Sequence, residues 1–141
     1  YVKEGDVVLM GVDNHATRKV VSEHVATLRS ALLISGGNTT FDGNIQVYHR
    51  VGGKDKTPPL HYLHPEIEFP RDKIPDDGDC VAAVKAGDVQ VLATNVMIAS
   101  LMLSAYTLYL EVGELPYNEV FCDIKTGNTR AVQRTWPPKS A

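Results

Sequence analysis

The first third of the chain alternates short apolar runs with one segment of helical periodicity. Residues 7–12 form a continuous apolar run rich in valine, which predicts a strand buried on both faces. The following segment repeats apolar residues every three to five positions as far as Arg29, which predicts an amphipathic helix. Residues 31–35 form a second buried run. Strand, helix and strand in this order predict a βαβ unit with parallel strands and a right-handed crossover.

The pattern changes after this unit. Gly36–Asn38 is expected to end the second strand, and residues 45–51 then alternate apolar with polar side chains. Such alternation predicts a strand with one solvent-exposed face and an antiparallel neighbour. Residues 52–79 show no regular period and contain five prolines, which predicts a long irregular loop.

The last third is predicted to be helical and then to form a hairpin. A short helix is expected over residues 80–86 and a longer one over residues 89–110, which contain no charged residue. The longer helix could span a bilayer by length, but its polar residues favour burial in a core or at a subunit interface. Residues 117–124 and 129–136 predict a β-hairpin around a Thr-Gly-Asn turn.

Composition limits the class of protein. The 141 residues are 43% hydrophobic, enough for one compact core, and the net charge of −3 argues against wide contact with nucleic acid. The two cysteines are far apart, without a CxxC pair, which argues against a zinc site and fits a reducing, cytoplasmic compartment. We find no signal peptide, and a chain that opens on Tyr1 is expected to be part of a longer protein.

The pair Asp13-Asn14 is the first candidate for chemistry. It follows a buried strand directly, and ligands of open α/β sheets bind at the carboxyl ends of strands. A carboxylate there is a suitable oxygen ligand for Mg²⁺. The alternative is that Asp13 or Asn14 only caps the following helix. Arg18, one helical turn further on, either reaches a phosphate or pairs with a surface carboxylate, and we favour the surface pairing slightly.

The cysteines and histidines are weaker candidates. Cys80 begins a predicted helix, whose dipole favours the thiolate, whereas three neighbouring aspartates disfavour it, so an inert buried cysteine is equally expected. Cys122 lies in the hairpin and is expected in the core. His61 and His64 lack a third ligand of suitable spacing, and we expect them only to be solvated or to pack within the loop.

The ordered series of these segments resembles a known family. A strand ending in Asp-Asn, an arginine four residues on, the stretch "FDGNIQVY", a long loop, an apolar helix and the hairpin "VFCDIKTGNTRAV" follow one another. This order resembles the latter half of the ThiF/MoeB-type adenylating domain, shared with ubiquitin-activating enzymes, and looks closest to ThiF-like proteins of bacterial plasmid and phage-type operons. The resemblance implies one partial domain over residues 1–141, with a Rossmann-like mixed sheet.

The resemblance also assigns parts and roles. It divides the domain into a βαβ unit plus strand (1–51), a crossover-type loop (52–79), helices (80–112) and a hairpin (117–136). It implies ATP and Mg²⁺ as cofactors, with Asp13 binding the metal and Asn14 and Arg18 near the nucleotide. The implied reaction adenylates the C-terminal glycine of a ubiquitin-like or sulfur-carrier protein, and Cys80 is the candidate acceptor of the activated acyl group. A homodimer or a partner chain is also implied.

The chain departs from that family in three respects. The glycine-rich loop that holds ATP, the basic contacts to the phosphates and the paired CxxC zinc motifs are all missing from this sequence. The sequence is therefore expected to supply half of an active site, and no zinc-binding site is expected. The alternatives are a scaffold or partner subunit that kept the fold without the chemistry, and, as a weaker reading, a membrane-anchored domain built around residues 89–110.

Overall fold

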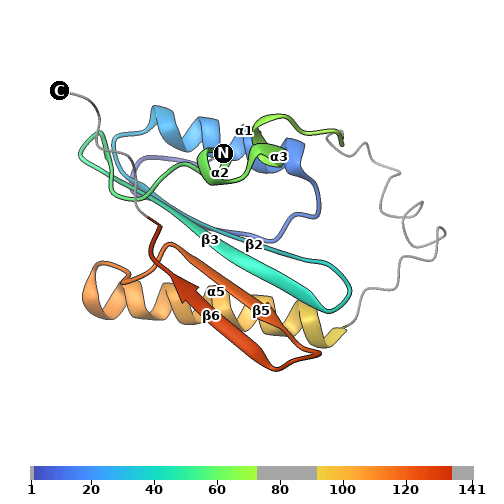
Figure 1. Cartoon of the computed structure of the whole chain (residues 1–141). Helices are drawn as coiled ribbons and strands as arrows, with labels where there is room; N and C mark the ends of the chain where they lie inside the picture. The colour runs from blue at the N-terminus through green and yellow to red at the C-terminus, as the bar shows by residue number, and fades with distance from the viewer. Residues whose placement is uncertain (1, 73–91, 135–141) are drawn as a thin grey trace.

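The computed structural model of the chain describes residues 2–72 and 92–134. Cys80, the predicted helix 80–86, the start of the predicted helix 89–110 and the ends of the predicted loop and hairpin lie outside these residues. Within them the protein is a mixed α/β domain with an open sheet, and the strands follow the order β1-β2-β3-β5-β6, with β4 paired to β3 (Figure 1).

The predicted βαβ unit is confirmed. β1 (Val7–Met10) pairs in parallel with β2 (Ala31–Asn38), and α1 (His15–Thr27) connects them. The expected break at Gly36–Asn38 is wrong, because β2 continues through these residues in register with β3. The glycines allow close packing there instead: a Cβ atom on Gly36 would lie 2.4 Å from Sδ of Met102.

The alternating segment forms β3 (Asp42–Val51), which runs antiparallel to both β2 and β5, as the pattern predicted. The solvent-exposed face was predicted wrongly. Gln46 and Tyr48, the polar members of the alternation, are buried, because α1 and the chain after β3 cover that face of the sheet.

The described part of the predicted irregular loop holds short elements. β4 (Lys54–Asp55) turns back and pairs antiparallel with the end of β3, and two four-residue helices follow, α2 (Leu60–Leu63) and α3 (Pro65–Glu68). Helices this short cannot show a 3.6-residue period, which explains why the sequence pattern missed them. Their apolar side chains Leu60 and Ile67 are buried against the sheet.

The second half of the described chain supplies the other layer. α5 (Leu92–Val112) packs on the face opposite α1, α2 and α3, and β5 (Glu119–Asp123) and β6 (Asn128–Val132) form the predicted hairpin at one side of the sheet (Figure 1). Gly127 adopts a φ of +71° in the turn, a conformation that glycine adopts readily.

α5 is buried on one side only, so the core, one of the two environments that the sequence favoured, covers part of the helix, and a subunit interface over the rest stays a prediction. Its buried residues are Thr94, Ile98, Met102 and Ala105, and its opposite side exposes leucine and valine side chains. By length and composition alone α5 could cross a membrane, and it is the one such helix in the described residues.

Candidate functional site

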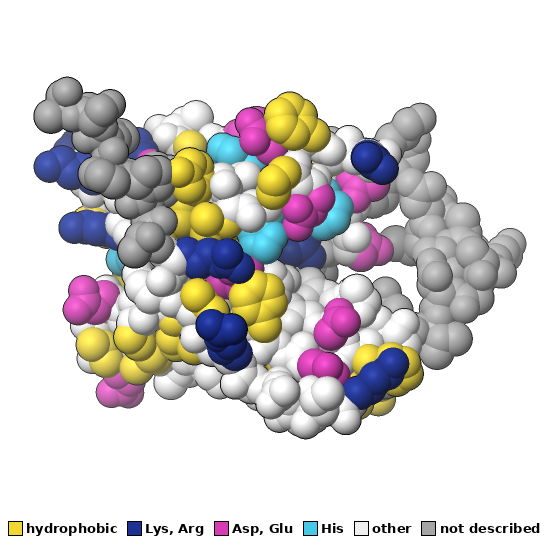
Figure 2. Space-filling model, viewed as in Figure 1, with side chains coloured by type: hydrophobic (Ala, Val, Ile, Leu, Met, Phe, Trp, Pro, Cys, Tyr) yellow, Lys and Arg dark blue, Asp and Glu magenta, His cyan; other side chains and the backbone are white. Residues whose placement is uncertain are grey.

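A cleft of about 860 Å³ opens where β1 and β2 end. Its walls come from the segment after β1, the end of β2, the start of β3, α3, the first half of α5, and the β5–β6 hairpin. Figure 2 shows acidic, basic and histidine side chains gathered in a band between α3 and this hairpin. We call this space the strand-end cleft, and its position is the one at which open α/β sheets bind ligands.

The structure separates the two members of the Asp13-Asn14 pair. Asn14 is the N-cap of α1, and its side-chain oxygen accepts a hydrogen bond of 2.7 Å from the backbone N–H of Thr17. Asp13 does not cap the helix; it is exposed and lines the strand-end cleft. The capping explanation therefore accounts for Asn14, whereas the Asp13 carboxylate accepts a long bond of 3.4 Å from the Asn14 amide and stays exposed to a ligand.

A second carboxylate occupies the N-terminus of α1. Asp72 accepts hydrogen bonds from the backbone N–H groups of His15, at 2.7 Å, and Ala16, at 2.9 Å. Partial burial raises the pKa of Asp72, but these two bonds outweigh that effect, and the net shift is downward. The first amides of α1, which would otherwise attract an anion, are thus already used by a residue that the sequence pattern did not single out.

Arg18 corrects one expectation. The favoured surface pairing is wrong: the side chain is only 5% exposed and makes no ion pair within the described residues. Its guanidinium instead donates to Oγ of Ser35 and to the backbone oxygens of Val12 and Gly36, at 2.9, 2.6 and 2.7 Å. Burial lowers its pKa, and the charges of Asp13 and Asp72 oppose that shift. Arg18 therefore ties the end of β1 to β2 at the cleft wall.

Three buried polar residues form a row across the sheet on the face that α1 and α3 cover. Ser35 on β2 pairs in register with Gln46 on β3, and Gln46 pairs with Glu119 on β5. All three are at most 7% exposed. Cross-strand partners point to the same side of a sheet, so this polar row lies beside the strand-end cleft.

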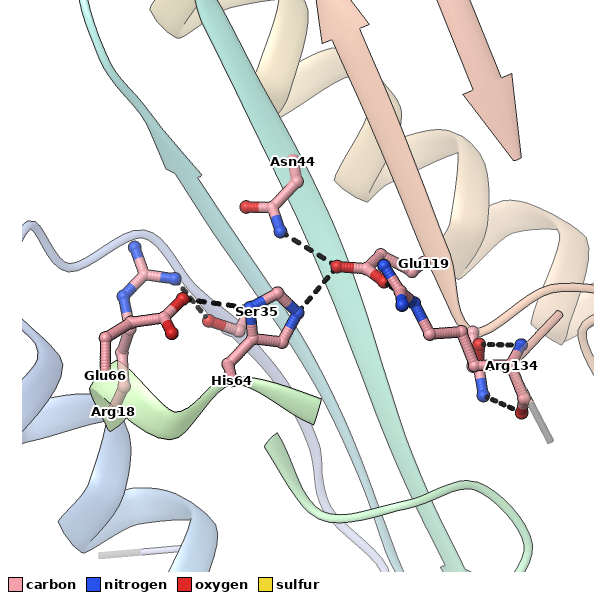
Figure 3. Close-up of polar contacts among 8 residues, drawn as sticks. Arg18, Ser35, Asn44, His64, Glu66, Glu119 and Arg134 are labelled. Carbon is pink, nitrogen blue, oxygen red and sulfur yellow. Dashed lines mark hydrogen bonds and ion pairs between the residues drawn. The ribbon is translucent and has the colours of Figure 1, made fainter. Parts of the chain in front are cut away.

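Glu119 is the centre of a charged network at the end of the polar row (Figure 3). Its carboxylate binds Nε2 of His64 and Nε of Arg134, both at 2.6 Å, and accepts a bond of 3.1 Å from Asn44. The other ring nitrogen of His64 lies 3.0 Å from Glu66. The charges satisfy one another, as buried charges require.

His64 has a larger role than the sequence indicated. It joins the α2–α3 segment to β5 through the carboxylate of Glu119 and also pairs with Glu66 of α3, whereas we expected it only to be solvated or to pack within the loop. Its partner Glu119 is 55 residues away, beyond the range of local patterns. One signal was present: Glu119 is an acidic residue at the start of an otherwise apolar strand segment, EVFC.

Stability should depend on pH through this network. Burial lowers the pKa of His64, but the bonds to Glu119 and Glu66 outweigh this effect, and the net shift is upward. Burial raises the pKa of Glu119, but the bonds from His64 and Arg134 outweigh this effect, and the net shift is downward. The stabilisation by charged His64 is fully present below its ordinary pKa of 6.5 and is lost as the pH rises through the raised pKa of the folded protein. The stabilisation by the Glu119 carboxylate is lost as the pH falls through its folded-state pKa, which lies below 4.5.

We therefore expect the melting temperature to be highest near pH 5 to 6 and to fall toward pH 8.5. His64→Gln should remove most of the fall above pH 6, whereas His24→Gln, a control on the exposed side of α1, should retain it. A His64→Gln protein with the wild-type pH profile would contradict the assignment. The measurement is thermal denaturation followed by far-ultraviolet circular dichroism.

The described cysteine behaves as predicted. Cys122 is 3% exposed in the core beneath α5, and burial raises the pKa of its thiol, which makes it a poor nucleophile. Its role is therefore packing, as the hairpin position indicated.

The described residues contain no cluster of three or more histidine, cysteine or acidic side chains suited to a metal ion. Mg²⁺ does not need such a cluster, because it is commonly bound by one or two carboxylates together with water and phosphate oxygens. The exposed carboxylate of Asp13 on the cleft wall fits that mode of binding.

The comparisons with known proteins add no family. A scan against protein-family models and a search of curated proteins both find no match for this chain.

Proposed function

We propose that the strand-end cleft activates a protein carboxylate with ATP, as the resemblance to ThiF/MoeB-type domains implies. The observation that carries the proposal is the position of Asp13: an exposed carboxylate with no capping role, on the wall of a large cleft at the carboxyl end of β1. The proposed substrate is the C-terminal glycine of a ubiquitin-like or sulfur-carrier protein.

In this proposal the residues of the chain position the reactants. The substrate carboxylate attacks the α-phosphorus of ATP, the bond to pyrophosphate breaks, and an acyl-adenylate forms. Asp13 would hold Mg²⁺, which neutralises phosphate charge when bound. Arg18 would keep the loop that carries Asp13 in place, through its bond to the backbone oxygen of Val12. The remaining phosphate contacts would come from sequence outside the described residues or from a second chain.

One observation favours the alternative of a scaffold without chemistry. Asp72 occupies the first amides of α1, so phosphate cannot bind them unless that carboxylate moves away. A scaffold would still bind the tail of a ubiquitin-like protein in the cleft, but it would not consume ATP.

ATP–pyrophosphate exchange separates the two functions. The protein at its full natural length is mixed with ATP, Mg²⁺, labelled pyrophosphate and candidate ubiquitin-like proteins that end in Gly-Gly. We expect exchange with a free C-terminal carboxylate and none with the same partner carrying a C-terminal carboxamide, because the amide cannot attack phosphorus. A folded protein that binds the tail without exchange would identify the scaffold and overturn the enzymatic proposal.

A further inference from the structure

The polar row contains one group that the fold leaves unsatisfied. Gln46 is 7% exposed and lines the strand-end cleft, and its Oε1 has no hydrogen-bond partner among the described residues. The neighbours on either side are satisfied: Ser35 accepts a bond from Arg18, and Glu119 binds His64 and Arg134 (Figure 3). Buried polar groups are nearly always paired, so an unpaired amide beside a cleft points to a ligand.

The hydrogen-bonding groups of the amide limit the class of ligand that can pair with it. A primary amide offers an acceptor and two donors, and the terminal torsion of glutamine is broad, so either end can turn toward the cleft. The matching ligand groups are a peptide main chain or the edge of an adenine ring. Apolar side chains such as Ile67 and Phe121 also line the cleft, but the cross-strand neighbours of Gln46 are a hydroxyl and a carboxylate, which suit a main chain better than the apolar faces of an adenine ring.

The shape of the cleft favours an extended chain. Gly37, Asn44, Phe121 and Arg130 all line the cleft and are consecutive cross-strand partners on β2, β3, β5 and β6. Three strand spacings of about 4.8 Å give a path of about 14 Å, and an extended peptide covers about 3.4 Å per residue. The cleft floor between these side chains is therefore long enough for about four residues of an extended peptide. The segment that carries Asp13 lengthens this path by about one more peptide residue.

We propose that Gln46 is a positioning residue that recognises the main chain of an extended peptide lying across the strand ends in the strand-end cleft. The inference rests on the proposed function in one respect, namely that the carboxyl end of this peptide points toward Asp13. The Oε1 atom is closed to solvent in this structure, so the amide turns about its terminal torsion and Oε1 then accepts a hydrogen bond from a main-chain N–H of the tail. This bond fixes the tail about one strand spacing from the wall on which Arg18 lies.

The inference can be tested without catalysis by combining a substitution in the protein with a modification of a bound peptide and measuring whether their effects on affinity are additive. The probe is a fluorescein-labelled five-residue peptide ending in Gly-Gly, compared with versions in which each main-chain N–H is methylated in turn, and binding is followed by fluorescence anisotropy. We expect Gln46→Leu to weaken binding of the parent peptide about tenfold. Methylation at one position should weaken binding to the wild type similarly and have no further effect on Gln46→Leu.

Two controls accompany these binding measurements. Gln133→Leu replaces an exposed glutamine outside the cleft lining and should bind every peptide as the wild type does. Gln46→Leu should fold with an equal or higher melting temperature, because it removes a buried amide oxygen that has no partner among the described residues. A marked fall in melting temperature would mean that the amide is satisfied within the fold, and it would overturn the inference.

The remaining outcomes separate this inference from the proposed function. Exchange by the wild type together with peptide affinity that is insensitive to Gln46→Leu would overturn the inference and leave adenylation standing. Peptide binding that depends on Gln46, without exchange, would support the inference and refute adenylation. A loss of ATP affinity in Gln46→Leu with unchanged peptide affinity would assign the amide to the nucleotide base and overturn the inference. Failure of the peptide to bind the wild type would also overturn it.

Discussion

Replacing Arg18 with leucine is expected to lower the free energy of unfolding by about 3 kcal/mol. The guanidinium joins Val12, Ser35 and Gly36 through three hydrogen bonds, and leucine would remove this donor from two backbone oxygens and one hydroxyl. Part of this loss is offset because a buried charge with no ion pair among the described residues is also removed. Urea denaturation followed by far-ultraviolet circular dichroism measures the difference.

Two further variants check the reason for this loss. Arg29→Leu removes an exposed arginine just after α1 and should change the free energy of unfolding by no more than about 0.5 kcal/mol. Gly37→Ala would bring a Cβ atom within 2.3 Å of the Arg18 guanidinium and should displace it. Because both changes break the same contacts, the double variant should be less destabilised than the sum of the single ones. Full additivity would show that the Arg18 contacts are not the cause.

Much of the fold could be predicted from local patterns. The βαβ unit, the antiparallel β3 and the hairpin follow from the apolar period and the turn residues, signals that lie within a few residues of one another. The errors occurred where distant segments decide the environment. Gln46 has the pattern of a solvent-exposed position, and it is buried because α3, about 20 residues later, covers that face of the sheet.

In the candidate site, as in the fold, local patterns predicted one feature correctly and contacts between distant segments were missed. Asp13 was predicted from its position at the end of a strand, and it does line the strand-end cleft. The link between His64 and Glu119 was not predicted, because it joins a short helix to a strand from the other end of the chain. The partners of Arg18 were predicted wrongly because two of them are backbone oxygens. Every residue has a backbone oxygen, so the sequence does not indicate which of them accept a hydrogen bond. Sequence patterns therefore identified a candidate ligand-binding carboxylate and missed the network around it.

Replacing Asp13 with asparagine is expected to lower the rate of ATP–pyrophosphate exchange about 100-fold while leaving stability nearly unchanged. The side chain is exposed and does not cap α1, so the fold depends little on it. Asparagine keeps the size of the side chain but removes the negative charge, which weakens binding of a cation that carries the nucleotide phosphates. The effect should fall mainly on exchange, and the melting temperature should move little.

Asp13 is proposed to lie at the nucleotide, and ATP–pyrophosphate exchange by matched variants tests this position most directly. Exchange rates are compared for the wild type, Asp13→Asn and Glu23→Gln at full natural length, with Mg²⁺ and a Gly-Gly-terminated partner. Glu23→Gln removes the same charge from an exposed position on α1, where Glu23 pairs with Lys19 at 3.8 Å. We predict exchange near 1% of the wild-type rate for Asp13→Asn, as an order-of-magnitude figure, and no change for Glu23→Gln. Equal exchange by all three proteins would contradict the claim.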